Sequence, residues 1–484
     1  MNRLDSSLYR RLLEELEVTE LRLSELAREN AFLRIDSEFN LKEPLAIIQR
    51  LRKAGAERFG ESDPVIIHPH EITREYVDSD GTWFFRAQNL RPLSIEESDK
   101  VFISASDASV LEKNRLEKGD VVITRTGANA GDCALFFSNH AAVASSHTFI
   151  VRSDSWSHPY LVAFFNSLYG KAQILRGRYG AAQPEVAPYY LRNIWIPRFS
   201  SAFCAGIGRL FERSHRQKTE ADVRFATAEQ MLLKALGLDA WRSPEQAITT
   251  RKLSEVLDNR RFDAEYFDPG AAAIIALLRE NGAVELDKFA HVATGFSWDS
   301  SQFIEDRIVS GEPFVRIRDC KPGELAPEDL DKLLASYALG CEQPKARAGD
   351  IVIGMDGLKW FYASLLTGPC YVNQRVAWVQ PRHSSEMSSE FVLLCLNSVI
   401  GQRQLLRAMT IAHTVGHIKL DDVRSVLIPQ LTQSVHDEIT EKVRSSYALQ
   451  REARLLLARA RQIVEVAIEQ GEAAGLTKLS QVKA

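Results

Sequence analysis

The sequence repeats itself at an almost constant spacing. Ile196-Pro197 precedes a long stretch with the pattern of an amphipathic helix, and Ile428-Pro429, 232 residues later, precedes another. Apolar residues at intervals of three and four lie along one face of a helix. In the first stretch they are Ile207, Leu210, Phe211, Ala228, Met231, Leu232, Ala235 and Leu236, and in the second Ile439, Val443, Ala460, Ile463, Val464, Ala467 and Ile468. Two such stretches at one fixed offset indicate a duplicated unit.

The duplication continues through the segments that precede each stretch. Residues 119–123 read GDVVI and residues 349–353 read GDIVI, each a turn glycine followed by a run typical of a buried strand. Residues 166–176 read NSLYGKAQILR, and residues 397–407 read NSVIGQRQLLR. Residues 34–39 and 261–266 read RIDSEF and RFDAEY. The chain is therefore predicted to contain two copies of one α+β domain, each followed by a long helix.

The repeat also sets the expected domain boundaries, because 484 residues are too many for one ordinary core. We expect an N-terminal helical segment at 1–43, whose helix pattern covers 6–33. The first globular domain is expected at 44–200 and the first long helix at 201–240. The second domain is then expected at 241–430 and the second long helix at 431–484.

Composition limits the class of protein. With 45% hydrophobic and 26% charged residues, the chain resembles an ordinary globular protein. No apolar run approaches the length of a membrane span, and the N-terminus passes into a charged helix without a signal segment, so we expect a cytoplasmic protein without membrane contact. The six cysteines show no paired spacing, which predicts reduced structural thiols and no metal site. A formal charge of −4 gives no general basic character, so any affinity for phosphate must come from local clusters.

Two loops of the first domain carry candidate contacts to a phosphate or a base. Residues 123–131 read ITRTGANAG, a strand that runs into a loop of small residues with Arg125 and Thr126. Such a loop could bring its backbone close to a phosphate, and the alternative is a plain glycine turn. Ser146 and His147 stand just before an apolar strand. They suggest a catalytic triad, but no acid stands at a recognisable spacing, so a base contact or a satisfied polar edge is the better interpretation.

A local basic patch follows in the same domain, where Glu185 is the only acid. It contains Lys171, Arg176, Arg178, Tyr179, Gln183 and Arg192. These residue types bind phosphates and read base edges, whereas the alternative is a solvated helix end. The second domain keeps the strands but changes the loops, which carry Lys359, Asn373, Gln374, Arg375, Arg407, His413 and Lys419. One fold with different polar tips predicts two recognition modules with different targets.

Two motifs resemble a known family. Residues 116–127 read LEKGDVVITRTG, and residues 180–184 read GAAQP before LRN at 191–193 and Ile196-Pro197. Here the sequence resembles the specificity subunit of type I restriction-modification systems, over nearly the whole chain. The second copy departs from the pattern, since residues 354–357 read GMDG and Thr414-Val415 stand where Gln183-Pro184 stood.

The resemblance implies a fold, a function and partners. Two target-recognition domains would be held apart by two long antiparallel helices, and each domain would read one half of a split, asymmetric site in double-stranded DNA. Partners would be modification (methyltransferase) subunits, normally two, that use S-adenosylmethionine, and motor endonuclease subunits that use ATP and Mg²⁺. This chain would itself hold no cofactor.

The candidate DNA contacts share a polar or basic side chain on a predicted loop or helix end. They are Arg86, Arg125, Thr126, Ser146, His147, Arg176, Arg178, Tyr179, Gln183, Lys359, Asn373, Gln374, Arg375, Arg407, His413 and Lys419. Arginine and glutamine could read guanine or adenine edges, while Arg176 is expected to hold phosphate. A spacer of about 30 helical residues would span roughly 45 Å, a little over one turn of B-DNA.

Three other functions stay open at this point. An enzyme is disfavoured, because the sequence shows no methyltransferase motif, glycine-rich cofactor fingerprint, phosphate-binding loop or nuclease cluster. A duplicated scaffold that binds only protein is permitted by the near-neutral charge. A specificity subunit of another methyltransferase-based defence system is the third alternative.

Overall fold

The computed structural model describes residues 16, 19–20, 22–24, 26, 34–78, 80–97, 99–180, 183–242, 249–304, 310–382, 387–412 and 414–482. The chain forms two compact units: unit 1 is Met1–Gln217 with Glu452–Ala484, and unit 2 is Lys218–Arg451. Most of the helix expected at 6–33 lies outside the described residues. The expected boundaries, which set each long helix apart as a spacer, stay a prediction.

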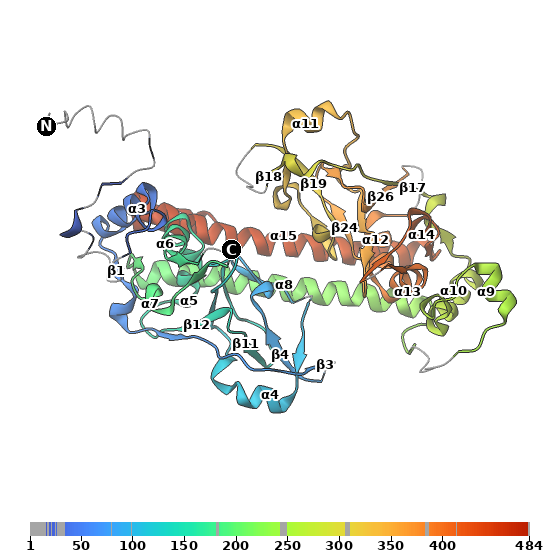
Figure 1. The fold of residues 1–484 in the computed structure, drawn as a ribbon, viewed down its shortest axis with the longest axis horizontal. Helices are drawn as coiled ribbons and strands as arrows, with labels where there is room; N and C mark the ends of the chain where they lie inside the picture. The colour runs from blue at the N-terminus through green and yellow to red at the C-terminus, as the bar shows by residue number, and fades with distance from the viewer. Residues whose placement is uncertain are drawn as a thin grey trace. The chain divides into compact units, whose positions relative to one another are not determined.

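Both units contain part of each long helix, α8 (Ser201–Ala235) and α15 (Gln433–Gln470) (Figure 1). In unit 1, Phe203 of α8 and Ala467 of α15 both lie against Gly475, and Arg213 forms an ion pair of 2.6 Å with Glu452. Residues later in α8 lie beside residues earlier in α15, so the two helices run antiparallel, as expected. In unit 2, Ser446 donates a hydrogen bond of 2.7 Å to the carbonyl oxygen of Ala221. The apolar faces read from the sequence pack into the core of each unit, except that Ala235 at the end of α8 is exposed.

Two β-sheets form the globular part of unit 1. The first is antiparallel and has the order β10-β9-β12-β2. Its strands are β2 (Val65–Ile67), β9 (Val121–Thr124), β10 (Cys133–Leu135) and β12 (Thr148–Arg152). The second has the order β3-β7-β4-β11-β8, and its β4 and β11 are parallel. Its strands are β3 (Tyr76–Val77), β4 (Thr82–Phe85), β7 (Phe102–Ile103), β8 (Arg115–Leu116) and β11 (Ala142–Ala144).

Unit 2 repeats this arrangement. One sheet has the order β17-β26-β22-β24-β20, with β17 (Ala290–Thr294), β20 (Gly323–Leu325), β22 (Ile351–Gly354), β24 (Ala363–Leu366) and β26 (Val376–Pro381). The other has the order β18-β21-β19-β25, with β18 (Phe303–Ile304), β19 (Glu312–Val315), β21 (Lys332–Leu333) and β25 (Tyr371–Val372). In this sheet β19 and β25 are parallel, and in the first sheet β20 and β24 are parallel. The duplicated α+β fold expected from the sequence is confirmed.

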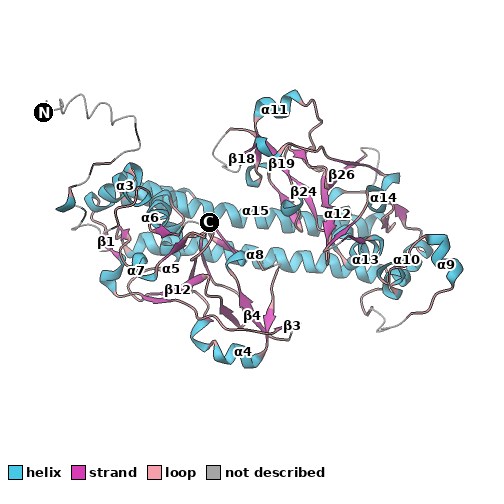
Figure 2. Cartoon of the chain, viewed as in Figure 1, coloured by secondary structure: helices cyan, strands magenta, loops and turns pink. Residues whose placement is uncertain are grey.

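Helices pack against one sheet in each unit (Figure 2). In unit 1 they are α3 (Lys42–Lys53), α5 (His158–Phe165) and α6 (Leu168–Arg176), and in unit 2 α10 (Pro269–Glu280), α12 (Ser389–Asn397) and α13 (Val399–Ala408). Other described helices are α4 (Ala105–Val110), α7 (Pro188–Leu191), α9 (Leu253–Asn259), α11 (Ala335–Gly340), α14 (Leu420–Arg424) and α16 (Glu472–Gln481). α5 and α12 are apolar almost all round because sheet and helices enclose them.

A buried glutamine connects helix and strand at the same place in each unit. The side chain of Gln173 accepts a hydrogen bond of 2.9 Å from the amide of Trp195 and donates one of 3.0 Å to its carbonyl oxygen. Gln404 pairs in the same way with Leu427, at 2.8 and 3.1 Å. The strands held are β15 (Trp195–Ile196) and β29 (Leu427–Ile428), which pair with β1 (Glu57–Arg58) and β16 (Val284–Glu285). The repeated glutamine therefore satisfies backbone groups that burial would leave without a partner.

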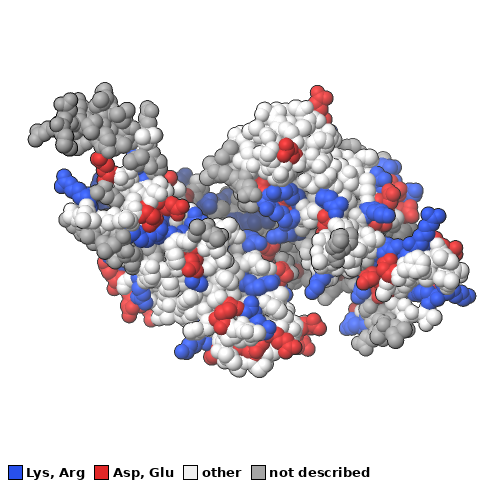
Figure 3. Space-filling model, viewed as in Figure 1, with Lys and Arg blue, Asp and Glu red and all other residues white. Residues whose placement is uncertain are grey.

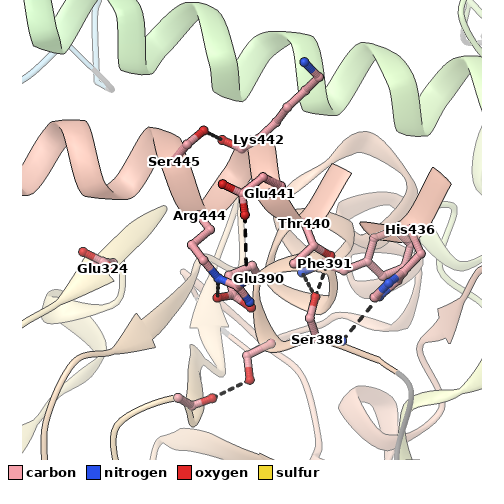
Figure 4. Close-up of polar contacts among 12 residues, drawn as sticks. Glu324, Ser388, Glu390, Phe391, His436, Thr440, Glu441, Lys442, Arg444 and Ser445 are labelled. Carbon is pink, nitrogen blue, oxygen red and sulfur yellow. Dashed lines mark hydrogen bonds and ion pairs between the residues drawn. The ribbon is translucent and has the colours of Figure 1, made fainter. Parts of the chain in front are cut away.

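The start of α15 is fixed to α12 in unit 2 (Figure 4). Ser388 caps α12 by accepting a hydrogen bond of 3.2 Å from the amide of Phe391, and its hydroxyl lies 2.8 Å from that of Thr440. The His436 ring packs on Phe391 with centroids 4.7 Å apart. Arg444 reaches from the next turn of α15 to Glu390, at 2.9 Å. The helix is thus anchored by capping, packing and an ion pair together.

Two further findings bear on the class of protein. No described helix is both long and apolar enough to cross a membrane. The six cysteines are free thiols, and four of them are buried. Burial raises the pKa of the Cys370 thiol to about 12, which keeps it protonated and unreactive at neutral pH. The structure thus agrees with structural thiols.

Candidate nucleic-acid interface

Three segments of unit 1 meet at one end of its antiparallel sheet. They are the loop after β9, the residues before β12 and the hairpin of β13 (Arg178–Tyr179) and β14 (Glu185–Val186). The amide of Arg125 donates to the carbonyl oxygen of His147 at 2.8 Å, and that of Val186 donates to Arg125 at 3.0 Å. The amide of Gly127 donates to Pro184 at 2.8 Å. Loops that are far apart in the sequence therefore form one surface.

Side chains connect the same three segments. Arg125 forms an ion pair with Glu185 at 2.5 Å and donates to the carbonyl oxygen of Ser146 at 3.3 Å. Thr126 Oγ1 lies 2.8 Å from His147 Nδ1 and shares a hydrogen bond with it. The hydrogen bond with Glu185 raises the pKa of the Tyr179 phenol. Arg125 thus serves as a cross-link whose charge is largely balanced by Glu185.

Other predicted residues of this surface are open to a ligand. His147, Tyr179 and Gln183 are exposed, and Arg178 is half-buried. Among the described residues, no hydrogen bond or ion pair of the Arg178 or Gln183 side chain was found. The Arg178 and Gln183 side chains therefore offer the donors and acceptors that base edges and phosphates require.

Sequence reasoning missed Glu71, which lies beside this surface. Its carboxylate accepts a hydrogen bond from the Ser146 hydroxyl and pairs with Arg74. Burial raises the pKa of Glu71, but these two bonds outweigh burial, and the pKa is lowered overall. The Glu71 carboxylate therefore holds the Ser146 hydroxyl in one direction, as a group that forms a hydrogen bond with a ligand requires. No spacing in the sequence could have paired residues 75 positions apart.

Arg86 follows β4, whose parallel partner β11 leads towards Ser146. Its guanidinium lies 3.0 Å from the carboxylate of Asp99, which also accepts a bond of 2.6 Å from Gln88. The equivalent Arg316 of unit 2 pairs with Asp331. Both arginines begin a short 3-10 turn closed by a side chain three residues later, Asn89 or Asp319. Arg86 thus occupies a repeated structural position as well as a possible binding position.

Unit 2 brings together the equivalent three segments with different chemistry. The loop after β22 forms β23 (Asp356–Gly357), which pairs with β28 (Val415–His417), and β28 pairs with β27 (Thr410–Ala412). Arg375 donates to Asp356 at 3.0 and 2.5 Å, and His417 Nδ1 lies 2.6 Å from the same carboxylate. An aspartate with two basic partners thus replaces the Arg125–Glu185 pair of unit 1.

The remaining candidates of unit 2 are placed as follows. Lys359, Gln374 and Lys419 are exposed. The Asn373 side chain accepts a hydrogen bond of 3.1 Å from the amide of Arg375, so it shapes the turn. His413 lies outside the described residues. Lys359 and Gln374 are therefore the exposed polar groups closest in sequence to the Asp356–Arg375 pair.

Arg176 and Arg407 are directed to other partners. Arg176 lies over the ring of Phe39, 3.7 Å from its centroid, and donates to the carbonyl oxygen of Phe39 at 2.6 Å. Arg407 lies over the ring of Tyr266 at 4.1 Å. Each arginine holds the segment that leads into its own unit, so its positive charge contributes to the stability of the fold.

Positive charge is local on this protein. On the face shown in Figure 3, lysine and arginine alternate with aspartate and glutamate over each unit. Among the described residues, no group of three or more histidines, cysteines, aspartates or glutamates could hold a metal ion. The arrangement offers hydrogen-bond donors and acceptors on two loop surfaces, one in each unit.

Comparisons with known proteins give a structural likeness. No family model matches the sequence, and no curated protein matches it. A specificity subunit of a type I restriction-modification system from M. genitalium is 11% identical with a TM-score of 0.36, covering 88% of this chain and 95% of that chain. The HsdS subunit from Thermoanaerobacter tengcongensis is 14% identical with a TM-score of 0.27, covering 87% and 97%. These two solved chains belong to the family that the sequence motifs resemble.

Proposed function

We propose that this chain is the DNA-specificity subunit of a type I restriction-modification complex. One observation carries the proposal. In each unit three equivalent segments converge on one surface, and the scaffold beneath is repeated while the exposed chemistry differs. The pairs Gln173–Trp195 and Gln404–Leu427 belong to the repeated scaffold. Two recognition surfaces on one duplicated fold suit a protein that reads two different half-sites.

The exposed side chains fit contacts to DNA. Bases offer distinct donors and acceptors in the major groove, where glutamine suits adenine and arginine or lysine suits guanine. Unit 1 would use Arg178, Gln183 and His147 for such contacts. Unit 2 would use Lys359, Gln374 and Lys419. The paired groups Arg125 and Arg375 would keep the loops in shape, so that exposed neighbours meet the DNA in a fixed geometry.

The long helices would set the distance between the half-sites. α8 has 35 residues and α15 has 38. At 1.5 Å per residue each spans about 50 Å, or about one and a half turns of B-DNA. The recognised site would then be bipartite, with an unread gap between its halves. This follows from the antiparallel pairing of the helices together with the family resemblance.

Catalysis would belong to partner subunits. The resemblance implies two modification subunits that use S-adenosylmethionine, and motor endonuclease subunits that use ATP and Mg²⁺. The long helices carry exposed apolar residues, among them Val223 on α8 and Leu455 on α15. Such residues supply surface on which modification subunits could dock. No cofactor is assigned to this chain.

The experiment that tests the function is methylome sequencing of cells with and without this chain. Loss of methylation at one bipartite sequence is the expected result. The complex with its modification subunits should also bind that sequence with an affinity that falls steeply as salt rises, because phosphate contacts release counterions. Binding to protein alone, without salt-sensitive and sequence-selective DNA binding, would favour the scaffold alternative. Methylation or cleavage by the purified chain alone would favour an enzyme.

The spacer role has its own test. Deleting residues 215–221 and 446–452 removes seven residues from each helix and keeps the hydrogen bond of 2.9 Å between Ser214 and Ala453. Seven residues are about two turns, so the helix faces stay aligned and the spacer shortens by about 10 Å, or about three base pairs. We expect a shorter gap with both half-sites unchanged. A gap of unchanged length would exclude the spacer role, and substitutions of exposed residues in the same segments are the control.

A further inference from the structure

A short turn of unit 2 is held rigidly at both ends. Before the turn, Asp356 is fixed by Arg375 and His417. After it, the backbone of buried Phe361 is held by Gln402, whose amide accepts a hydrogen bond from its N–H and donates to its carbonyl oxygen, each at 2.9 Å. The residues between these anchors are presented in a fixed position.

The turn presents apolar side chains to solvent. Leu358 is 54% exposed, Trp360 is 49% exposed and Val415 of the adjoining strand is 41% exposed. Gly357 pairs with Gly416 between β23 and β28, so Leu358 and Val415 take adjacent positions beyond that pair. The Trp360 ring is stacked against Tyr362, with centroids 6.1 Å apart and planes within 7°. We call Leu358, Trp360 and Val415 the apolar tip.

The apolar tip is specific to the second copy. In the repeat, Leu358 stands where unit 1 has Ala128, Trp360 where it has Ala130, and Val415 where it has Pro184. The two copies therefore differ in exposed side chains on a turn that is held at both ends in unit 2. Grouped apolar residues on the surface of a folded protein mark an interaction site more often than chance exposure does.

The surroundings of the tip indicate its ligand. Lys359 stands between Leu358 and Trp360 and is exposed, and no ion pair of its ammonium group was found among the described residues. Lys419 is exposed just beyond β28. The tip continues the surface to which we have assigned DNA reading. A cationic rim around an apolar centre suits the major groove, where the C5-methyl group of thymine is the apolar feature of the base edges.

We propose that the apolar tip reads thymine methyl groups in the half-site bound by unit 2. This inference rests on the proposed function. It predicts a half-site with at least one A·T pair, in which specificity comes partly from burial of a methyl group. Burying one methyl-sized group contributes about 0.8 kcal/mol, which corresponds to about fourfold in affinity.

The test uses the complex of the full chain with its modification subunits and the DNA site found by methylome sequencing. Each thymine of the site is replaced in turn by deoxyuridine, which lacks only the methyl group, and Kd is measured by competition. We expect affinity to fall about fourfold for at least one thymine of the unit 2 half-site. No fall there while the unmodified site binds selectively overturns the inference and leaves the proposed function standing. Absence of selective binding overturns both.

Variants connect the methyl group to the tip. Leu358→Asn and Val415→Asn each replace an apolar side chain by a polar one of roughly similar size, and both positions are exposed, so the fold should tolerate them. We expect these variants to bind the thymine and deoxyuridine sites equally. Leu339→Asn on α11, 61% exposed and outside this surface, is the matched control and should keep the preference for thymine.

Two results with the variants would overturn the inference. One is an undiminished preference for thymine in both Leu358→Asn and Val415→Asn. The other is a variant that assembles less completely with the modification subunits, while the complex that does form still prefers thymine. That second result would show that the tip binds protein.

Discussion

The guanidinium group of Arg176 lies 3.7 Å from the centroid of the Phe39 ring. A second guanidinium, from Arg34, approaches the same ring at 4.7 Å and forms an ion pair of 2.8 Å with Asp36. Unit 2 repeats the arrangement, with Arg407 and Arg261 at 4.1 and 4.8 Å from Tyr266. In both units an aromatic ring of the segment that leads into the fold contacts two arginine side chains, and these contacts hold the segment in place.

Arg176→Ala should therefore destabilise unit 1 without changing the sequence that it reads. The variant loses a cation–π contact, worth about 0.5–2 kcal/mol, and a charge-assisted hydrogen bond to Phe39, worth about 1.5–3 kcal/mol. A lower Tm by differential scanning calorimetry, with an unchanged methylated sequence, is the expected result. Arg178→Ala is the control, because Arg178 has no such partner among the described residues, and it should leave Tm unchanged. An altered half-site with Arg176→Ala would restore this residue as a DNA contact.

Gln183→Ala should change the half-site read by unit 1 and no other. The side chain is exposed at the tip of the β13–β14 hairpin, where an amide can form two hydrogen bonds with adenine. Loss of a base-reading side chain costs about 1–3 kcal/mol and relaxes preference at one position. Methylation across a library randomised in both halves would measure this. A change in the other half-site, or none while binding persists, would contradict the assignment.

Glu229→Gln should stabilise the chain at neutral pH. Burial on α8 raises the pKa of Glu229 above its ordinary value of 4.5. The folded chain therefore holds this proton more tightly than the unfolded chain, and stability falls as pH rises from about 4.5 through the raised pKa. The variant should have a higher Tm than the wild type at pH 7, and the difference should shrink towards pH 4.5. Glu438→Gln on α15, at an exposed position, should show little effect.

Gln404→Leu should lower the stability of unit 2. The substitution keeps the side-chain volume approximately but leaves the amide and carbonyl oxygen of Leu427 without their partner. An unpaired buried polar group costs about 1–3 kcal/mol. Hydrogen exchange should accelerate at the amide of Leu427 and stay unchanged at Trp195, which Gln173 holds. Equal acceleration in both units would show that they do not unfold independently.

The sequence predicted the repeated scaffold well because repeated residues have repeated partners. Residues 166–176 and 397–407 were identified from their letters, and their side chains form equivalent contacts. The candidate site was predicted less completely. Arg125 is neutralised by Glu185, and Arg176 stacks on Phe39, because pairings across 60 and 137 residues depend on how strands are ordered in space. No local pattern contains that information.

The strand that begins each globular part lies beside the strand that ends it. Glu57 of β1 pairs with Ile196 of β15, and Val284 of β16 pairs with Ile428 of β29. A part that starts and finishes at neighbouring strands can be exchanged as a cassette with only two junctions. Under the proposed function, exchange of one such cassette would replace one half-site and leave the other unchanged. The incoming cassette would need an arginine at the position of Arg176 or Arg407, because the aromatic ring that this arginine contacts, Phe39 or Tyr266, lies before the cassette.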